Sequence, residues 1–521
     1  MSERPNFLFV ITDQQRADHL GCYGNRVLRT PVIDRLAAAG RRFNRFYVAN
    51  PSCQPNRASI MTGRMPSLHG VHHNGVPLAH EATTFVDLLR AAGYRTALLG
   101  KAHLQNFTGR PPVQRFAPAE GLQPPPPALQ DASKARRDGP DYEIENELAW
   151  PAPAMERWRK PYYGFEHFEI ASNHGDLVAG DYLFWARERR GDFDTLRGRA
   201  AAAGVSPSGA PQAWRTRIPE ELYPTSYVAE RTIAWLETHR REQLAAPFFV
   251  QMSFPDPHYP FTPPGRYWDM YDPAEITLPD SFGDTASPPI RAMKAALKAG
   301  RAFREGHAPF AATADEARAI IALTYGMITM IDDAVGRVLD ALARLDLARN
   351  TIVIFTSDHG DYMADHGIML KAGLHYQGLI RVPFIWREPD DRPQISEALG
   401  SSIDIPATVL RRAGLQPFHG MQGRDLLDPG ADPDGILIES DNPGFAGDVA
   451  ARTRTLVTPR WRLSLYKGAG GELYDLERDP GEMNNLWNDA ASARARAELQ
   501  ALMAERLIAM QDNAPLQTGL S

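Results

Sequence analysis

Continuous apolar runs, separated by helical segments, constrain the fold of this chain more than any other feature. Asn6–Thr12 (NFLFVIT) and Thr351–Thr356 (TIVIFT) lack a polar face, as expected for strands covered on both sides. Thr30–Gly40 carries helix signals: a threonine N-cap, a proline in the first turn and a terminal glycine. Further strands are predicted at Tyr94–Gly100, Pro247–Phe254 and Val382–Trp386, and further helices at Thr84–Ala92, Ser226–Glu242 and Asp315–Leu345. This alternation predicts an α/β fold, with a large mixed, mostly parallel sheet sandwiched by helices.

The alternation weakens after about residue 428, which divides the chain into two predicted parts. Residues 1–427 form the larger α/β domain, which would carry the chemistry. Residues 428–521 contain short strands at Gly435–Ser440, Trp461–Tyr466 and Glu472–Asp475 and a final helix at Ala490–Gln511, and they predict a small antiparallel subdomain. The larger domain is interrupted at 110–158, which is rich in proline, and at 187–219, which is rich in Arg, Ala and Gly. We interpret both mainly as irregular surface insertions; a lid or an oligomer contact is the alternative.

Composition excludes several classes of protein. Hydrophobic residues make up 43% of the chain, which is enough for a large core. The net charge of −6 provides no global attraction to nucleic acid or to an anionic membrane, so anion binding would need a local basic cluster. The two cysteines, Cys22 and Cys53, form no disulfide framework, and two free thiols are favoured over one bridge. The N-terminus lacks the pattern of a signal peptide and no apolar run approaches ~20 residues, so we expect no membrane span and a cytoplasmic location.

Polar side chains follow four of the predicted strands. Ligands of open α/β sheets bind beyond the carboxyl ends of the strands, so these side chains should meet at one edge. Each of them alone would more often be a surface charge or a structural histidine. The coincidence of four strand ends predicts a site. Its members are Asp13 and Gln14, Lys101 and His103, His258, and Asp358 and His359.

The residue types at these strand ends suit a metal and an anion together. Asp13 and Asp358 offer carboxylate oxygens, Gln14 a carbonyl oxygen and His359 an imidazole nitrogen. This mixed set favours Mn²⁺, Mg²⁺ or Ca²⁺ over a zinc–thiolate site. Cationic and donor groups around such a metal would neutralise a tetrahedral oxyanion. These groups are Lys101, His103, His258 and Lys371.

The segment NPSCQPNRASIMTGR supplies a candidate nucleophile. Pro55 fits the first turn of a short helix and Gly63 its end, so Cys53 lies at the helix N-terminus with Arg57 one turn on. This setting favours bound anions and is expected to lower the pKa of the thiol. A buried structural cysteine and a plain thiolate nucleophile are the alternatives. Hard cations prefer an oxygen nucleophile to a sulfur, which counts against the thiolate.

Several motifs together resemble the sulfatase family, a branch of the alkaline phosphatase superfamily. Cys53-Gln54-Pro55-Asn56-Arg57, followed by Thr62-Gly63-Arg64, looks like the sulfatase signature C-x-P-x-R-x4-T-G-R. The other matches lie along nearly the whole chain outside the two insertions. They are Gly100-Lys101-Ala102-His103, Pro257-His258-Tyr259-Pro260, Phe355–Gly360, Lys371 with Arg381-Val382-Pro383, and Glu472–Asp475 with Asp479-Pro480 and Asn485-Leu486.

The resemblance implies a specific mechanism. A formylglycine-generating enzyme would oxidise Cys53 to formylglycine (3-oxoalanine), whose hydrated diol attacks sulfur or phosphorus while Arg57 and one divalent ion hold it. The second diol oxygen would lose its proton to His103, and the ester would then leave by elimination. The implied metal ligands are Asp13, Gln14, position 53, Asp358 and His359, around Mn²⁺ or Ca²⁺. The implied substrate contacts are Lys101, His258, Lys371 and, as an oxyanion donor, Asn74.

The sequence departs from the common sulfatase pattern at two metal positions. Many sulfatases pair two aspartates after the first strand and Asp-Asn after the later one, whereas this chain has Asp13-Gln14 and Asp358-His359. This is similar to the branch of phosphonate monoester hydrolases, choline sulfatases and promiscuous arylsulfatases. A site with two carboxylates in place of three is less anionic and makes Mn²⁺ as plausible as Ca²⁺.

Three functions follow from this pattern. Lys101 and His103 keep the sulfatase pattern, so a small-molecule sulfate monoester is the first expectation for the substrate. Hydrolysis of phosphonate monoesters or phosphodiesters is the close alternative, either in place of sulfate hydrolysis or as a second activity of one promiscuous enzyme. A catalytically inactive anion-binding protein is the third. The motifs do not identify the leaving group, and they are compatible with a homodimer or homotetramer.

Overall fold

Nine strands form the main sheet of the computed structural model, in the order β13–β2–β12–β10–β1–β8–β3–β4–β5. The structure describes residues 4–111, 116–148, 150–242, 245–283, 287–389, 392–428, 430, 433–441 and 452–519. The strands are β1 (Asn6–Thr12), β2 (Arg41–Tyr47), β3 (Arg95–Gly100), β4 (His167–Ser172), β5 (Ala179–Gly180), β8 (Phe248–Ser253), β10 (Thr351–Ser357), β12 (Phe384–Arg387) and β13 (Gln394–Ser401). The central pairs β10–β1, β1–β8, β8–β3 and β3–β4 are parallel, whereas β12 runs antiparallel to both β10 and β2. The predicted mixed, mostly parallel sheet is confirmed.

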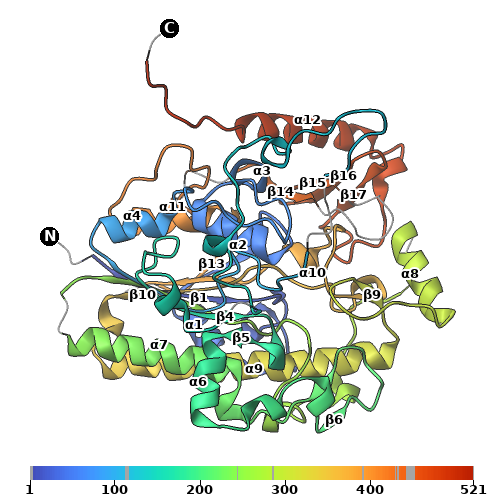
Figure 1. Cartoon of the computed structure of the whole chain (residues 1–521). Helices are drawn as coiled ribbons and strands as arrows, with labels where there is room; N and C mark the ends of the chain where they lie inside the picture. Colours follow the sequence, from blue (N-terminus) through green and yellow to red (C-terminus); the bar gives the residue numbers. More distant parts are fainter. Residues whose placement is uncertain are drawn as a thin grey trace.

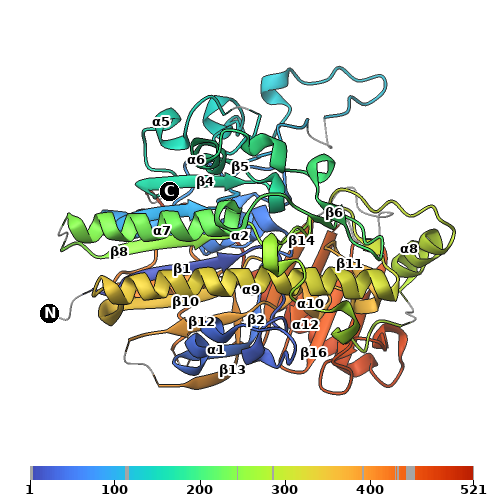
Figure 2. The same cartoon turned by 90° about the horizontal axis from the view of Figure 1, so that it is seen from below.

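Helices cover both faces of this sheet, as Figures 1 and 2 show. One face carries α1 (Pro31–Ala38), α7 (Pro224–Arg241) and α9 (Ala314–Arg344), and the other carries α2 (Cys53–Thr62), α4 (Phe85–Ala91) and α11 (Asp404–Arg412). The other helices of this part of the chain are α3 (Pro66–His69), α5 (Ala154–Arg157), α6 (Asp181–Arg189), α8 (Pro288–Lys298) and α10 (Gln377–Ile380).

The continuous apolar run of β1 is explained by these two layers. Leu8 and Val10 pack into the core beneath α9, whereas Phe7, Phe9 and Ile11 pack into the core beneath α2. Because successive side chains point to opposite faces, a strand buried on both faces needs apolar residues at every position.

Helix α9 is long and apolar enough to cross a membrane by length and composition alone. However, 89% of its most apolar window is buried inside the protein. This burial is typical of the central helix of a large core.

A second, four-stranded antiparallel sheet lies in the C-terminal part of the chain; it confirms the predicted small antiparallel subdomain and includes one strand, at Arg452–Val457, that was not predicted. Its order is β14 (Ile436–Asp441), β15 (Arg452–Val457), β16 (Trp461–Tyr466) and β17 (Gly470–Asp475), and α12 (Ala493–Ala509) packs against it. Gln377 at the start of α10 donates its backbone N–H to Glu482 Oε2 at 2.7 Å, and this hydrogen bond connects the C-terminal part of the chain to the part that contains the larger sheet. The division of the chain at 427/428 stays a prediction.

The two insertions differ in how deeply they pack. Residues 116–139 are almost entirely exposed, but Glu145, a few residues further on, is buried. In the second insertion, Phe193 and Leu196 pack into the core on the α7 side. Parts of both insertions therefore belong to the body of the protein.

Candidate active site

The predicted strand ends meet at the carboxyl edge of the sheet. Since β1 and β10 are parallel neighbours with Thr12 opposite Ser357, the residues that follow them are adjacent. The backbone N–H of Asp358 donates to Thr12 O at 3.0 Å, which holds the two chain turns together. At the end of β3, Gly100 has φ +111°, and a Cβ there would collide with the carbonyl oxygen of Ser253 on β8. Only glycine therefore lets β3 pass so close to β8 before Lys101.

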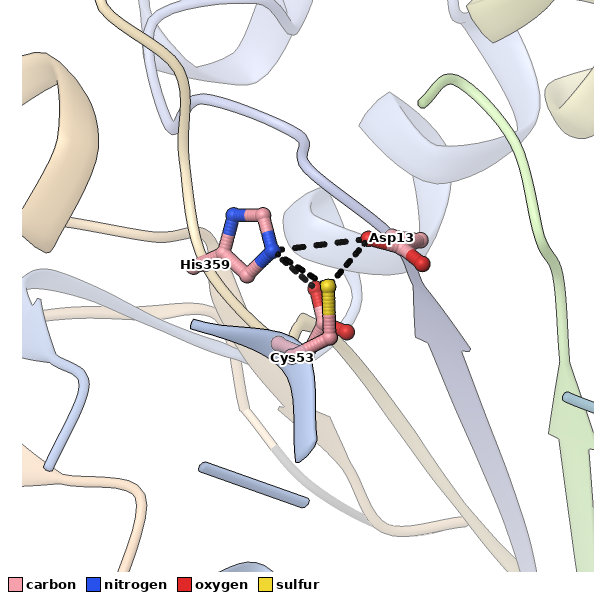
Figure 3. Close-up of side chains that lie close together, drawn as sticks. Asp13, Cys53 and His359 are labelled. Carbon is pink, nitrogen blue, oxygen red and sulfur yellow. Dashed lines mark hydrogen bonds and ion pairs between the residues drawn. The ribbon is translucent and has the colours of Figure 1, made fainter. Parts of the chain in front are cut away.

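Cys53 is the first residue of α2 and lies at the centre of the site. It is 1% exposed, and all ten residues of α2 are buried. Its Sγ lies 3.5 Å from Asp13 Oδ1 and 3.0 Å from His359 Nε2. Dashed lines in Figure 3 mark both contacts. Lys371 Nζ donates to the same sulfur at 2.9 Å. The candidate nucleophile therefore touches both the acidic and the basic parts of the site.

A group of side chains around Cys53 fits a divalent cation. One ligand atom from each of Asp13, Cys53, Asp358 and His359 lies within 4.8 Å of the others, and all four residues are buried. His359 Nδ1 donates to Gly360 O at 2.7 Å, so its Nε2 keeps a lone pair that faces the cluster. The two carboxylates and the imidazole match the donors that Mn²⁺ or Ca²⁺ accepts.

Gln14 completes this donor set through its side-chain oxygen. Its Nε2 donates to Asp361 Oδ2 at 2.5 Å, whereas its buried Oε1 has no hydrogen-bond partner among the described residues. A buried carbonyl oxygen without a partner is costly unless a cation or water satisfies it. The residues present therefore fit the predicted metal.

Asp361 holds Gln14 in this orientation. Asp361 also accepts hydrogen bonds from the backbone N–H groups of Met363 at 2.6 Å and Leu370 at 2.9 Å, which shapes the loop that ends at Lys371.

We expect Asp361→Ala to weaken binding of the divalent ion by about 10- to 100-fold, because partners of metal ligands orient those ligands. Titration of metal-free protein with Mn²⁺ or Ca²⁺ measures this change. Asp138→Ala, at an exposed position, is the control, and equal affinities in the two variants would refute the role.

The pKa values of Asp13 and Cys53 are shifted in opposite directions. Burial alone would raise the pKa of Asp13, but the charge of Lys101, with smaller contributions from His258 and His174, holds it well below its usual value. Burial raises the pKa of the Cys53 thiol to about 11, and Asp13 adds to the rise. The predicted lowering of the thiol pKa at a helix N-terminus is therefore wrong, because desolvation outweighs the helix dipole and the lysines. Cys53 as encoded is a poor thiolate.

Three cationic side chains surround the acidic cluster. Arg57 Nε pairs with Asp358 Oδ2 at 2.7 Å, and its Nη1 donates to Lys101 O at 2.8 Å. Lys101 Nζ is bonded to Asp13 Oδ2, and Lys371 Nζ lies 3.1 Å from His258 Nε2. Buried cations beside a nucleophile would stabilise an anionic substrate more strongly than they could in water.

Two predicted site residues, His103 and Asn74, make no hydrogen bond to Cys53 Sγ among the described residues. His103 donates its backbone N–H to Glu145 Oε2 at 2.6 Å, its ring packs on Phe107, and its buried Nδ1 has no partner among the described residues. Asn74 is exposed, and its Oδ1 accepts the Gln54 backbone N–H at 3.2 Å. The proton-accepting role of His103 and the oxyanion role of Asn74 stay predictions.

The sequence reasoning missed His174 and Glu145. His174 follows β4, a strand that was not predicted, and its Nε2 lies 2.7 Å from Lys101 Nζ. Glu145 accepts the backbone N–H groups of His103, Leu104 and Gln105 and so fixes the loop after β3. Recognising β4 would have revealed His174 by the same strand-end argument, whereas nothing in the proline-rich insertion singles out Glu145.

A buried nucleophile position beside metal ligands and lysines, at the carboxyl edge of an α/β sheet, defines a class of metal-assisted ester hydrolases. Comparison with known proteins gives the family. The sequence model of the sulfatase family matches residues 5–415, and that of the N-sulphoglucosamine sulphohydrolase C-terminal region matches residues 364–512. The chain belongs to the sulfatase family and is a sulfuric ester hydrolase.

Individual relatives agree with this assignment. An arylsulfatase of Clostridium perfringens is 29% identical over 510 residues, which cover 93% of this chain and 90% of the relative. The multifunctional alkaline phosphatase superfamily protein PehA of Trinickia caryophylli is 30% identical over 440 residues, which cover 81% and 76%. The crystal structure of a phosphonate monoester hydrolase of Agrobacterium radiobacter has the same fold, with a TM-score of 0.76 at 24% identity and coverage of 99% and 98%. The predicted alkaline phosphatase-like architecture is confirmed.

Proposed function

We propose that this protein hydrolyses aryl or alkyl sulfate monoesters and releases inorganic sulfate, with a formylglycine made from Cys53. The observation that carries the proposal is the position of Cys53. Its sulfur lies 3.0 Å from His359 Nε2 and 2.9 Å from Lys371 Nζ, within the sequence C-x-P-x-R. Because the encoded thiol is buried and its pKa is raised to about 11, it is a poor nucleophile without modification.

Each residue around position 53 would have a separate role in the reaction. The hydrated formylglycine supplies an oxygen nucleophile, and a bound divalent ion, Mn²⁺ or Ca²⁺, supplies Lewis-acid stabilisation. Asp13, Gln14, Asp358 and His359 would hold that ion. Lys101, His258 and Lys371 would neutralise charge on the substrate oxygens, Arg57 would orient position 53, and His103 would accept the proton that starts release of sulfate.

Hydrolysis of phosphonate monoesters or phosphodiesters by the same groups is the second candidate. It is favoured by the charge of the site, where two carboxylates, Asp13 and Asp358, face the three cationic groups Arg57, Lys101 and Lys371. Such a site tolerates a substrate with more negative charge. The similarity to PehA, whose name describes it as multifunctional, points the same way.

Two measurements test the proposal. The kcat/KM values for an aryl sulfate and for an aryl phosphonate monoester decide between the two substrates. Mass spectrometry of the peptide that contains Cys53 should show a mass about 18 Da below that of cysteine, the thiol-to-aldehyde change. Full activity with an unmodified Cys53 would refute the formylglycine mechanism. The proposal also requires a formylglycine-generating enzyme as maturation partner. The predicted homodimer or homotetramer can be tested by measuring the molar mass of the protein by light scattering.

A further inference from the structure

His174 lies inside the active site although no sequence motif includes it. It is 3% exposed and follows β4, where Asn173 with φ +70° turns the chain toward the site. Asparagine tolerates this left-handed conformation better than most residues. The turn is fixed by the first insertion, since Asn173 Nδ2 donates to Glu147 Oε2 at 2.8 Å and Ser172 Oγ donates to Glu145 O at 2.9 Å. The position of the His174 ring is therefore built into the fold.

The ring of His174 connects the two lysines of the site through His258. Lys101 Nζ donates to His174 Nε2 at 2.7 Å, and Lys371 Nζ donates to His258 Nε2 at 3.1 Å. The two imidazoles are stacked, with centroids 3.5 Å apart and planes 10° from parallel. His258 Nδ1 donates to Tyr259 O at 2.6 Å, which leaves its Nε2 as an acceptor. The result is a continuous chain of contacts from Lys101 to Lys371.

The same residues could be read as a second metal site. One ligand atom each from Asp13, His174 and His258 lies within 4.8 Å of the others. However, the ammonium group of Lys101 is already bonded to both Asp13 and His174, and that of Lys371 contacts His258. A divalent cation there would be repelled by two positive charges at short range. The geometry favours the lysine over a metal at this position.

We propose that His174 is a positioning residue that aims Lys101 at the departing ester oxygen. This inference rests on the proposed ester hydrolysis. A lysine ammonium has three N–H donors, of which Asp13 takes one and His174 a second, so the third has a fixed direction. The stacked His258 ring is held by its hydrogen bonds to Tyr259 O and Lys371 Nζ. As the ester bond breaks, negative charge grows on the leaving oxygen, and a preoriented ammonium stabilises it.

Two variants separate the hydrogen bond of His174 from its stacking. His174→Phe keeps a flat ring but removes the acceptor, whereas His174→Gln keeps an acceptor but removes the ring. The rates would be measured over a series of aryl esters, from 4-nitrophenyl to phenyl, as sulfates and as phosphonate monoesters. We expect His174→Phe to slow the phenyl esters by roughly 10-fold more than the 4-nitrophenyl esters, since a poor leaving group needs the ammonium most. His174→Gln should restore most of that difference.

The controls distinguish this role from the alternatives. His419→Gln, at an exposed histidine whose Nε2 lies near Asn513 O, should leave the whole series unchanged. Equal slowing of all leaving groups by His174→Phe would overturn the proposal in favour of a general packing role. Loss of one metal equivalent in either His174 variant would overturn it in favour of a metal ligand. If the wild type hydrolysed neither series, the proposed function itself would fail, and the role of His174 with it.

Discussion

Replacing Cys53 by serine is expected to lower kcat/KM by about 10⁴-fold or more, the loss typical of removing a nucleophile. Serine keeps one oxygen beside Asp13 and His359 but cannot carry two hydroxyl groups on one carbon. An ester formed on serine could therefore not leave by elimination, and turnover would stop after the first attack. Intact-protein mass spectrometry after incubation with substrate should show a trapped sulfate ester on the variant.

The second cysteine supplies the matched control. Cys22 is half-buried, and its backbone N–H donates to Asp34 Oδ1 at 2.7 Å, on the side of the sheet that carries α1. Cys22→Ser should keep wild-type rates. If Cys53→Ser turned over repeatedly at near wild-type rates, the elimination mechanism would be excluded, whatever the state of the wild-type residue.

Replacing His258 by alanine is expected to lower kcat by roughly 10²- to 10⁴-fold, the range for a lost acid–base or oxyanion-stabilising group. Two neighbours depend on this ring: Lys371 Nζ donates to it, and His174 stacks on it. Without it both would have more freedom, so the loss should appear mainly in kcat. Steady-state kinetics with saturating metal measures the effect, with His419→Ala as the control. A change in KM alone would mean that His258 only binds substrate.

The central strands and most side chains of the site could be predicted because local sequence determines them. Apolar runs such as Asn6–Thr12 report burial on both faces, and the residue after each run lies at the carboxyl edge by geometry. Strand β2 escaped prediction because RRFNRFY alternates poorly, and β4 because HFEIAS mixes charged and apolar residues. Missing β4 meant missing His174.

Other properties of the site depend on packing that no local pattern reveals. The pKa of Cys53 was predicted from its helix alone, but the layers above α2 remove water from the thiol and reverse the sign of the shift. The sequence does not show that Gln14 Oε1 lacks a hydrogen-bond partner, because the side chain is oriented by the hydrogen bond from Gln14 Nε2 to Asp361. Likewise, the contact between His103 and Glu145 joins residues 42 positions apart, and Glu145 lies in an insertion whose sequence shows no recognisable pattern.

The complete burial of α2 has a consequence for when the proposed modification of Cys53 could take place. An enzyme that oxidises Cys53 must bind the residues around it, yet in the folded chain all residues of α2 are buried. If Cys53 is oxidised as we propose, the burial of α2 requires the oxidation to come before the domain folds, while the chain is still being synthesised or is held unfolded. On the proposed mechanism, chain expressed without the modifying enzyme would fold into inactive protein, and adding that enzyme to the native protein would not restore activity.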